Sequence, residues 1–121
     1  MAATLGGEIE RLDRLRPNDY AWADKVGWLS ALDGRIQEQL LGGTGDFSGY
    51  GPETEGEQAL LIQGPYADIY LKWLTAQVDL NNLEGARYSA SQAAFEAGWA
   101  ELARWLTRTR SAPARYIRTA L

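Results

Sequence analysis

The side chains that most often carry catalysis are missing from this sequence. Its 121 residues include no cysteine and no histidine. Their absence excludes Ser-His-Asp and Cys-His nucleophile chemistry, disulfides and cysteine-held metals, and it removes the commonest ligand of transition metals. Paired carboxylates are the catalytic groups that remain open to the chain.

The carboxylates do not form a convincing catalytic or metal-binding pattern. Asp68 and Asp79 fall on one predicted helix, eleven positions apart, which is roughly 16 Å along its axis and too far to share a proton or a water. Glu53, Glu55 and Glu57 alternate in a glycine-rich segment and lack the spacing of a calcium loop. A solvated acidic loop explains them better. We therefore expect no enzyme activity, no catalytic residue, no metal site and no cofactor.

Charge is distributed unevenly along the chain. The formal net charge is −4, which argues against a nucleic-acid binder driven by bulk charge. Residues 1–101 hold all 16 acidic residues and seven basic ones, whereas residues 102–121 hold five arginines and no acid. The two parts are therefore expected to meet partners of different charge.

Apolar residues recur at helical spacing in four segments. They predict an all-α fold, a small four-helix bundle with helices near 4–15, 20–41, 65–82 and 84–108. We expect one helical domain over 1–110, with a long Gly-rich acidic loop at 42–58 between the second and third helices. Pro113 should end the last helix and leave 111–121 as a flexible, extended, basic C-terminal tail. No apolar run approaches the ~20 residues that span a bilayer, so we expect a cytosolic chain without membrane contact.

The five tryptophans are open to two interpretations. Most fall on or beside apolar helical stripes, which is typical of core packing. Trp28 and Trp105 lie off the main stripes and are the candidates for an interface between subunits, where Trp is enriched.

Short motifs along the chain, taken in order, resemble the head–tail connector (adaptor, or neck) proteins of long-tailed bacteriophages. The family commonly shows a Pro-Tyr-x-x-x-Tyr opening, an Ala-Gln-Ile/Val-Asp run, an Asn/Gly turn, a Glu-x-x-x-Tyr-x-x-Ser segment and an aromatic last helix. The matching residues are Pro65, Tyr66, Tyr70, Ala76-Gln77-Val78-Asp79, Asn81-Asn82, Glu84, Tyr88, Ser91, Phe95, Trp99 and Trp105. Two upstream segments fit the same pattern, Arg16-Pro17-Asn18 and Leu32-Asp33-Gly34-Arg35-Ile36.

The resemblance covers most of residues 5–108 and implies a structural virion protein rather than an enzyme. Such subunits form a homo-oligomeric ring, usually a dodecamer, beneath the portal protein of the filled head. The ring extends the channel through which DNA passes, without sequence-specific binding, toward a tail-side neck or tail terminator protein. The implied location is the virion neck, with the host cytoplasm during assembly. The loop at 42–58 and the tail after Thr107 have no counterpart in the family pattern.

Two segments are therefore assigned roles as hypotheses. The loop is expected to face the DNA channel or the ring, and the alternative is a surface loop without a role. Its residues are Asp46, Phe47, Tyr50, Glu53, Glu55 and Glu57. The tail is expected to dock on the portal, and the alternative is contact with DNA. Its docking residues are Arg110, Arg115, Tyr116, Ile117, Arg118 and Leu121.

Two functions of other classes remain open from the sequence. One is a small helical regulatory or adaptor module of a cell, acting as a dimer through its aromatic face. The other is an enzyme built on a metal–carboxylate site. Measurement of the particle mass in solution distinguishes the dimeric module from a ring subunit. A ring, or a series of oligomers that grows with concentration, indicates the ring subunit, and a stable dimer indicates the module.

Overall fold

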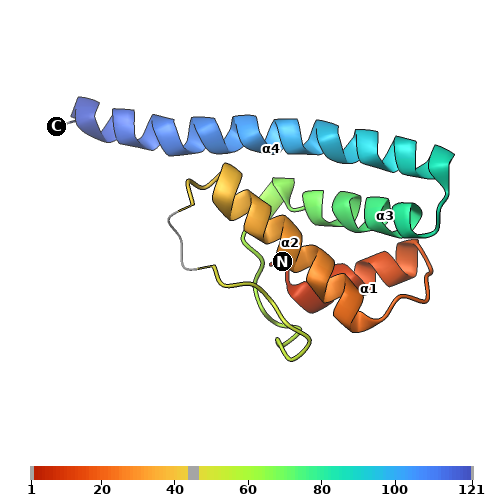
Figure 1. Cartoon of the computed structure of the whole chain (residues 1–121). Helices are drawn as coiled ribbons and strands as arrows, with labels where there is room; N and C mark the ends of the chain where they lie inside the picture. The colour runs from red at the N-terminus through yellow and green to blue at the C-terminus, as the bar shows by residue number, and fades with distance from the viewer. Residues whose placement is uncertain (1, 44–46, 121) are drawn as a thin grey trace.

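The computed structural model describes residues 2–43 and 47–120, with side chains described as far as residue 109. The chain folds as four α-helices, α1 (Leu5–Leu15), α2 (Trp22–Gln39), α3 (Ile69–Asn81) and α4 (Gly85–Ala120) (Figure 1). A short 3-10 turn, η1 (Gly64–Tyr66), precedes α3. Over the described residues there is no strand, only an isolated bridge between Thr4 and Ala59. The predicted all-α fold with four helices is confirmed.

The helix α1 begins at a side-chain cap. Thr4 has extended backbone angles, and its hydroxyl accepts a 3.0 Å hydrogen bond from the Gly7 amide. Such a cap satisfies one of the free N–H groups at a helix start. Leu5, Ile9 and Leu12 are buried as their spacing predicts. Leu15, on the same predicted stripe, is 57% exposed because it lies in the last turn of the helix.

The helix α2 begins two residues later than the sequence predicts. The N-cap is Ala21, without a side-chain hydrogen bond. Asn18 instead accepts from the Tyr20 amide at 3.1 Å in the connection. Trp22, expected inside, is 39% exposed because it is the first residue of the helix, whereas Val26, Leu29, Leu32 and Ile36 are buried.

The predicted third helix is divided in two. The residues after Gln63 first form η1, where Pro65 fixes its own φ, and regular α-helix starts only at Ile69. The most extensive packing in the molecule is between α3 and α4, which run antiparallel (Figure 1). Leu80, expected on the inner face, is 45% exposed because α3 ends one residue later.

The helix α4 differs most from the sequence prediction. We expected it to end near 108 and to be followed by an extended tail, but it remains helical to Ala120. Pro113 removes one backbone hydrogen bond, and the flanking Ala112, Ala114 and Arg115 favour helix. At 1.5 Å per residue α4 is about 54 Å long, and Figure 1 shows its C-terminal part projecting past α2 and α3.

The connection between α2 and η1 lies against the start of α1. The amides of Leu5 and Gly6 donate to the carbonyl oxygens of Gln58 and Gly56 at 2.9 and 2.8 Å. Gly6 has to be glycine here, because a Cβ would lie 3.0 Å from the Gly56 Cα. The segment at 59–62 contains no strand; Ala59 makes the isolated bridge to Thr4, and the chain bends at Leu61.

Candidate functional site

A first polar cluster joins three helices at the end of the molecule where α3 turns into α4. Asp79 is 1% exposed, and its carboxylate accepts from the Arg16 guanidinium and, at 2.8 Å, from the Ser91 hydroxyl. Arg16 also lies 3.8 Å from the carboxylate of Glu84. A buried carboxylate needs such partners, because removing its charge from water is costly. The cluster fixes the end of α1 against the α3–α4 hairpin.

A second cluster surrounds Asp33, which is fully buried on α2. Its carboxylate accepts from the Tyr70 and Tyr50 hydroxyls, both at 2.6 Å, and from the Leu61 amide at 3.1 Å. The Tyr70 hydroxyl in turn accepts from the Ile62 amide at 2.8 Å. One side chain therefore binds together α2, α3 and the α2–η1 connection.

Burial and hydrogen bonding act in opposite directions on Asp33. Burial raises the pKa of its carboxyl group above the ordinary value, and the donors Tyr50, Tyr70 and Leu61 counter part of that rise. The same burial, with the negative charge of Asp33 beside them, raises the pKa of both tyrosines. Neither phenol is thus suited to act as a base, and the cluster is suited to hold the fold.

The loop residues proposed to face a channel or ring divide into two groups. Tyr50 binds Asp33, and the Phe47 ring packs edge-on against Tyr50 with 5.0 Å between centroids, so both lie half-buried against the body. The carboxylates of Glu53, Glu55 and Glu57 are exposed. Asp46 lies outside the described residues. Among the described residues of this set, the three glutamates are the ones exposed to a partner.

The two interface candidates among the tryptophans are half-buried and packed within the chain. Trp28 packs edge-on against Tyr20 at 5.4 Å, and its carbonyl oxygen accepts from the Trp73 indole at 2.8 Å. Trp105 stacks on Tyr66 with 4.8 Å between ring centroids and 22° between planes. Each ring keeps only part of its surface free for another subunit.

The two aspartates considered for paired-carboxylate chemistry have different partners. Asp68 lies 2.9 Å from the Arg11 guanidinium, and Asp79 belongs to the cluster with Arg16. A carboxylate that sequence analysis did not single out, Glu8, is buried near Arg11, and its Oε1 has no hydrogen bond. Burial raises the pKa of Glu8, and the nearby Arg11 guanidinium partly offsets this. Over the described residues, no three potential metal ligands come together.

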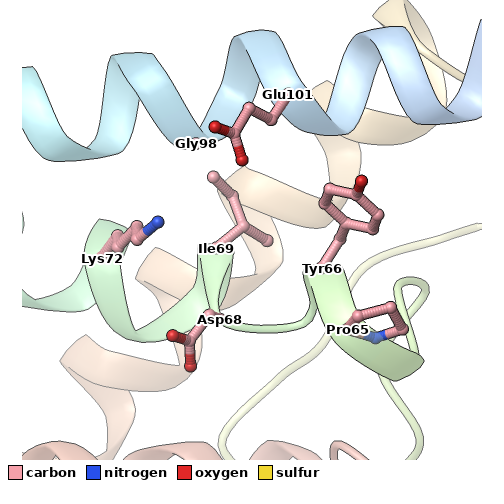
Figure 2. Close-up of a pocket in the computed structure, with 7 residues that line it drawn as sticks. All are labelled: Pro65, Tyr66, Asp68, Ile69, Lys72, Gly98 and Glu101. Carbon is pink, nitrogen blue, oxygen red and sulfur yellow. The ribbon is translucent and has the colours of Figure 1, made fainter.

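A small pocket of about 220 Å³ lies between the start of α3 and α4 (Figure 2). Tyr66, Ile69 and Lys72 line it from one side, and Gly98 and Glu101 line it from α4. Gly98 makes room for Lys72, because a Cβ there would come within 3.2 Å of the lysine Nζ. Its mixed charges do not resemble a catalytic arrangement.

The C-terminal half of α4 presents a basic surface. Arg104 and Arg108 are exposed and one helical turn apart, and with Ala103 and Thr107 they line a shallow groove of about 370 Å³. The proposed portal-docking residues follow on the same helix, and their side chains lie outside the described part of the chain. They are Arg110, Arg115, Tyr116, Ile117, Arg118 and, beyond the helix, Leu121.

Three structural features, two buried charged side chains and one close approach between helices, could not be predicted from the sequence. The burial of Glu8 and of Lys25, whose ammonium lies 2.6 Å from Asp13, depends on how α1 and α2 cross. The approach of Lys72 to Gly98 depends on the register of α3 against α4. The only signal for these in the sequence is that Gly98 interrupts an alanine-rich helix.

Comparison of the chain with family models, with curated proteins and with solved structures finds no match. In the part of the chain that the structure describes, none of the helices combines the length and apolar character needed to cross a membrane.

Proposed function

We propose that this chain is a structural virion protein, a ring-forming head–tail adaptor that docks beneath the portal and extends the DNA channel toward the tail. One observation carries the proposal. The residues by which the sequence resembles the connector family come from separate motifs, and they contact one another in the fold.

The contacts cross from motif to motif. Arg16, from the Arg-Pro-Asn segment, binds Asp79 at the end of the Ala-Gln-Val-Asp run. Asp79 also accepts from Ser91, the last position of the Glu-x-x-x-Tyr-x-x-Ser segment. Asp33, from the second upstream segment, accepts from Tyr70, which closes the Pro-Tyr-x-x-x-Tyr opening. The motif residues therefore include the side chains that hold the helices together, which supports the resemblance.

The distribution of surface charge supports a subunit that meets different partners at different faces. The exposed acids of the α2–η1 connection and the arginines of α4 lie on separate parts of the molecule (Figure 1). We assign the C-terminal part of α4 to the portal, because it projects past the bundle and carries arginines without acids. Of the two orientations open to the acidic connection, toward the channel or toward the ring, we assign its exposed carboxylates to the ring, where they meet a neighbouring subunit.

In this proposal the chain acts by binding and positioning, not by catalysis. The ring, a dodecamer by the family resemblance, has the portal on one side and a tail-side neck or tail terminator protein on the other. DNA passes through without sequence-specific contact. The location is the virion neck, and the host cytoplasm during assembly.

Removal of the gene from the phage that carries it tests the proposal. We expect DNA-filled heads and complete tails to accumulate separately, because the joint between them is missing, and the intact chain supplied in trans should restore infectious particles. Electron micrographs that show joined virions without the chain would contradict the proposal. A stable dimer in the cell with no effect on virions would instead favour a regulatory or adaptor module.

A further inference from the structure

The acidic residues after α2 form a positioned surface. The segment that carries Glu53, Glu55 and Glu57, which we call the acidic segment, is held at both ends. Before it, the Tyr50 hydroxyl binds Asp33 and the Tyr50 amide donates to the Ser30 hydroxyl at 3.0 Å. After it, the Gln58 carbonyl oxygen accepts from Leu5 at 2.9 Å. The three carboxylates are exposed, and no ion pair forms between them and any described residue.

A complementary surface lies on α4. The shallow groove lined by Ala103, Arg104, Thr107 and Arg108, which we call the arginine groove, carries two exposed guanidinium groups one helical turn apart. Neither arginine takes part in an ion pair with a described residue. Arginine is suited to this role because its planar guanidinium pairs with a carboxylate through two hydrogen bonds.

The two surfaces cannot meet within one chain. In Figure 1 the connection that follows α2 begins at the end of α2, and its olive middle part, residues 50–58 by the colour bar, lies beyond α2 on the side away from α4. Their opposite charges can therefore be paired only by another molecule. Since the two surfaces differ, a copy that uses its acidic segment on one neighbour keeps its arginine groove for the next. Such a heterologous contact produces a closed ring or an open chain of subunits.

We infer that a second copy of this chain docks its acidic segment in the arginine groove, head to tail. This contact deepens the proposed function and rests on it, because it names the surfaces that join neighbouring subunits in the ring. Exposed ion pairs each contribute little to binding, and they weaken with salt. The contact by itself is therefore weak, and it forms at high local concentration, such as that on a portal.

Disulfide trapping tests the contact directly, because the chain has no cysteine of its own. The variant Glu55→Cys/Thr107→Cys places one thiol on each surface and keeps both arginines and two of the three glutamates. On mild oxidation at low salt and high protein concentration, we expect a ladder of covalent oligomers beyond the dimer. Each single-cysteine variant can give at most dimers. The matched control Glu55→Cys/Ala93→Cys, whose second thiol is exposed on α4 away from the groove, should give no ladder.

Charge reversal tests whether the carboxylates and guanidiniums drive the contact. Arg104→Glu and Arg108→Glu, added to the double-cysteine variant, should slow ladder formation at least tenfold. Further addition of Glu53→Lys and Glu57→Lys should restore it, because the charges are again complementary. All four positions are exposed, so unchanged far-UV circular dichroism is expected and should be verified.

Three results would overturn the contact. They are the absence of a ladder, a ladder equal to that of the Ala93 control, and a ladder that charge reversal leaves unchanged. Absence of a ladder together with salt-sensitive binding of a DNA duplex that Arg104→Glu abolishes would assign the groove to DNA instead. These measurements use the purified chain, so a negative result would contradict only the contact between copies. The proposed function itself would be contradicted by normal virions that form without the gene.

Discussion

Asp33 joins three parts of the chain, namely α2, α3 and the α2–η1 connection. Its carboxylate accepts three hydrogen bonds, from Tyr70, Tyr50 and the Leu61 amide. In Asp33→Asn the new NH₂ group would face at least one donor, so a buried hydrogen bond would be lost and a group left without a partner. We expect a loss of about 2–4 kcal/mol in the free energy of unfolding, measured by urea denaturation.

The control for this prediction is Asp24→Asn, an exposed carboxylate on the same helix, which should change stability by less than about 0.5 kcal/mol. Tyr50→Phe removes a single donor and should cost about 1–2 kcal/mol. If Asp33→Asn changed the free energy of unfolding as little as Asp24→Asn, the conclusion that this cluster holds the fold together would be wrong.

Substitution of Glu8, unlike that of Asp33, should stabilise the chain, and the size of this gain should depend on pH. Burial raises the folded-state pKa of Glu8, so its ionised form reduces stability at neutral pH, and this cost disappears as pH falls through the raised pKa. Glu8→Gln should therefore stabilise the chain at pH 7, by about 0.5–1 kcal/mol, with the gain shrinking toward about pH 4 to 5.

Urea denaturation of the original chain and of Glu8→Gln, at pH 7 and at about pH 4 to 5, measures this difference in the free energy of unfolding. Glu10→Gln, at an exposed position on the same helix, serves as the control and should have little effect at either pH. Destabilisation of Glu8→Gln at pH 7, or a gain that grows as pH falls, would show that the buried carboxylate is favourably paired.

Sequence spacing predicted side-chain burial well in the middle of helices and poorly at their ends. Val26, Leu29, Leu32 and Ile36 are all buried, because the apolar stripe in the middle of a helix faces the body on which the helix packs. Trp22 and Leu80 continue the same periodicity but lie in terminal turns, where burial depends on which other element covers them. One sequence does not contain that information.

At the level of elements, the α3–α4 turn combines two unfavourable features at one residue. Leu83 has a φ of 59°, the left-handed region that favours glycine, and its side chain is 89% exposed. Leu83→Gly should therefore relieve backbone strain without losing packing. We expect a gain of about 0.5–1 kcal/mol in the free energy of unfolding, measured by urea denaturation.

Leu83→Ala is the matched control, because it removes the side chain but keeps the strained backbone. It should give no gain. Equal stabilisation by both substitutions would mean that the exposed leucine, and not the left-handed conformation, carries the cost.

The elements also show where sequence reasoning reached its limit. The order and number of helices followed from apolar periodicity, and Gly42-Gly43 and Asn81-Asn82 correctly marked the ends of α2 and α3 within two or three residues. Pro113 did not end α4, which remains helical to Ala120. The pairing of Tyr50 with Asp33 joins residues seventeen positions apart and had no local signal.

For the whole molecule, the C-terminal part of α4 is expected to act in docking and not in folding. Deletion of 111–121 should leave the free energy of unfolding of the body within about 1 kcal/mol of the full chain, because Leu106 is the last buried residue among those whose side chains are described. The truncated chain should nevertheless fail to join DNA-filled heads. Cosedimentation with purified heads measures this, and normal incorporation would mean that another surface docks on the portal.

The central claim, that the chain is a ring subunit beneath the portal, is tested most directly by electron microscopy. Purified chain is added to DNA-filled, tailless heads of the phage that encodes it, and the portal vertex is imaged. The account predicts added ring-shaped density of this chain, centred on the channel at the tail-side mouth of the portal. Bare portal vertices at saturating concentrations of folded chain would contradict it.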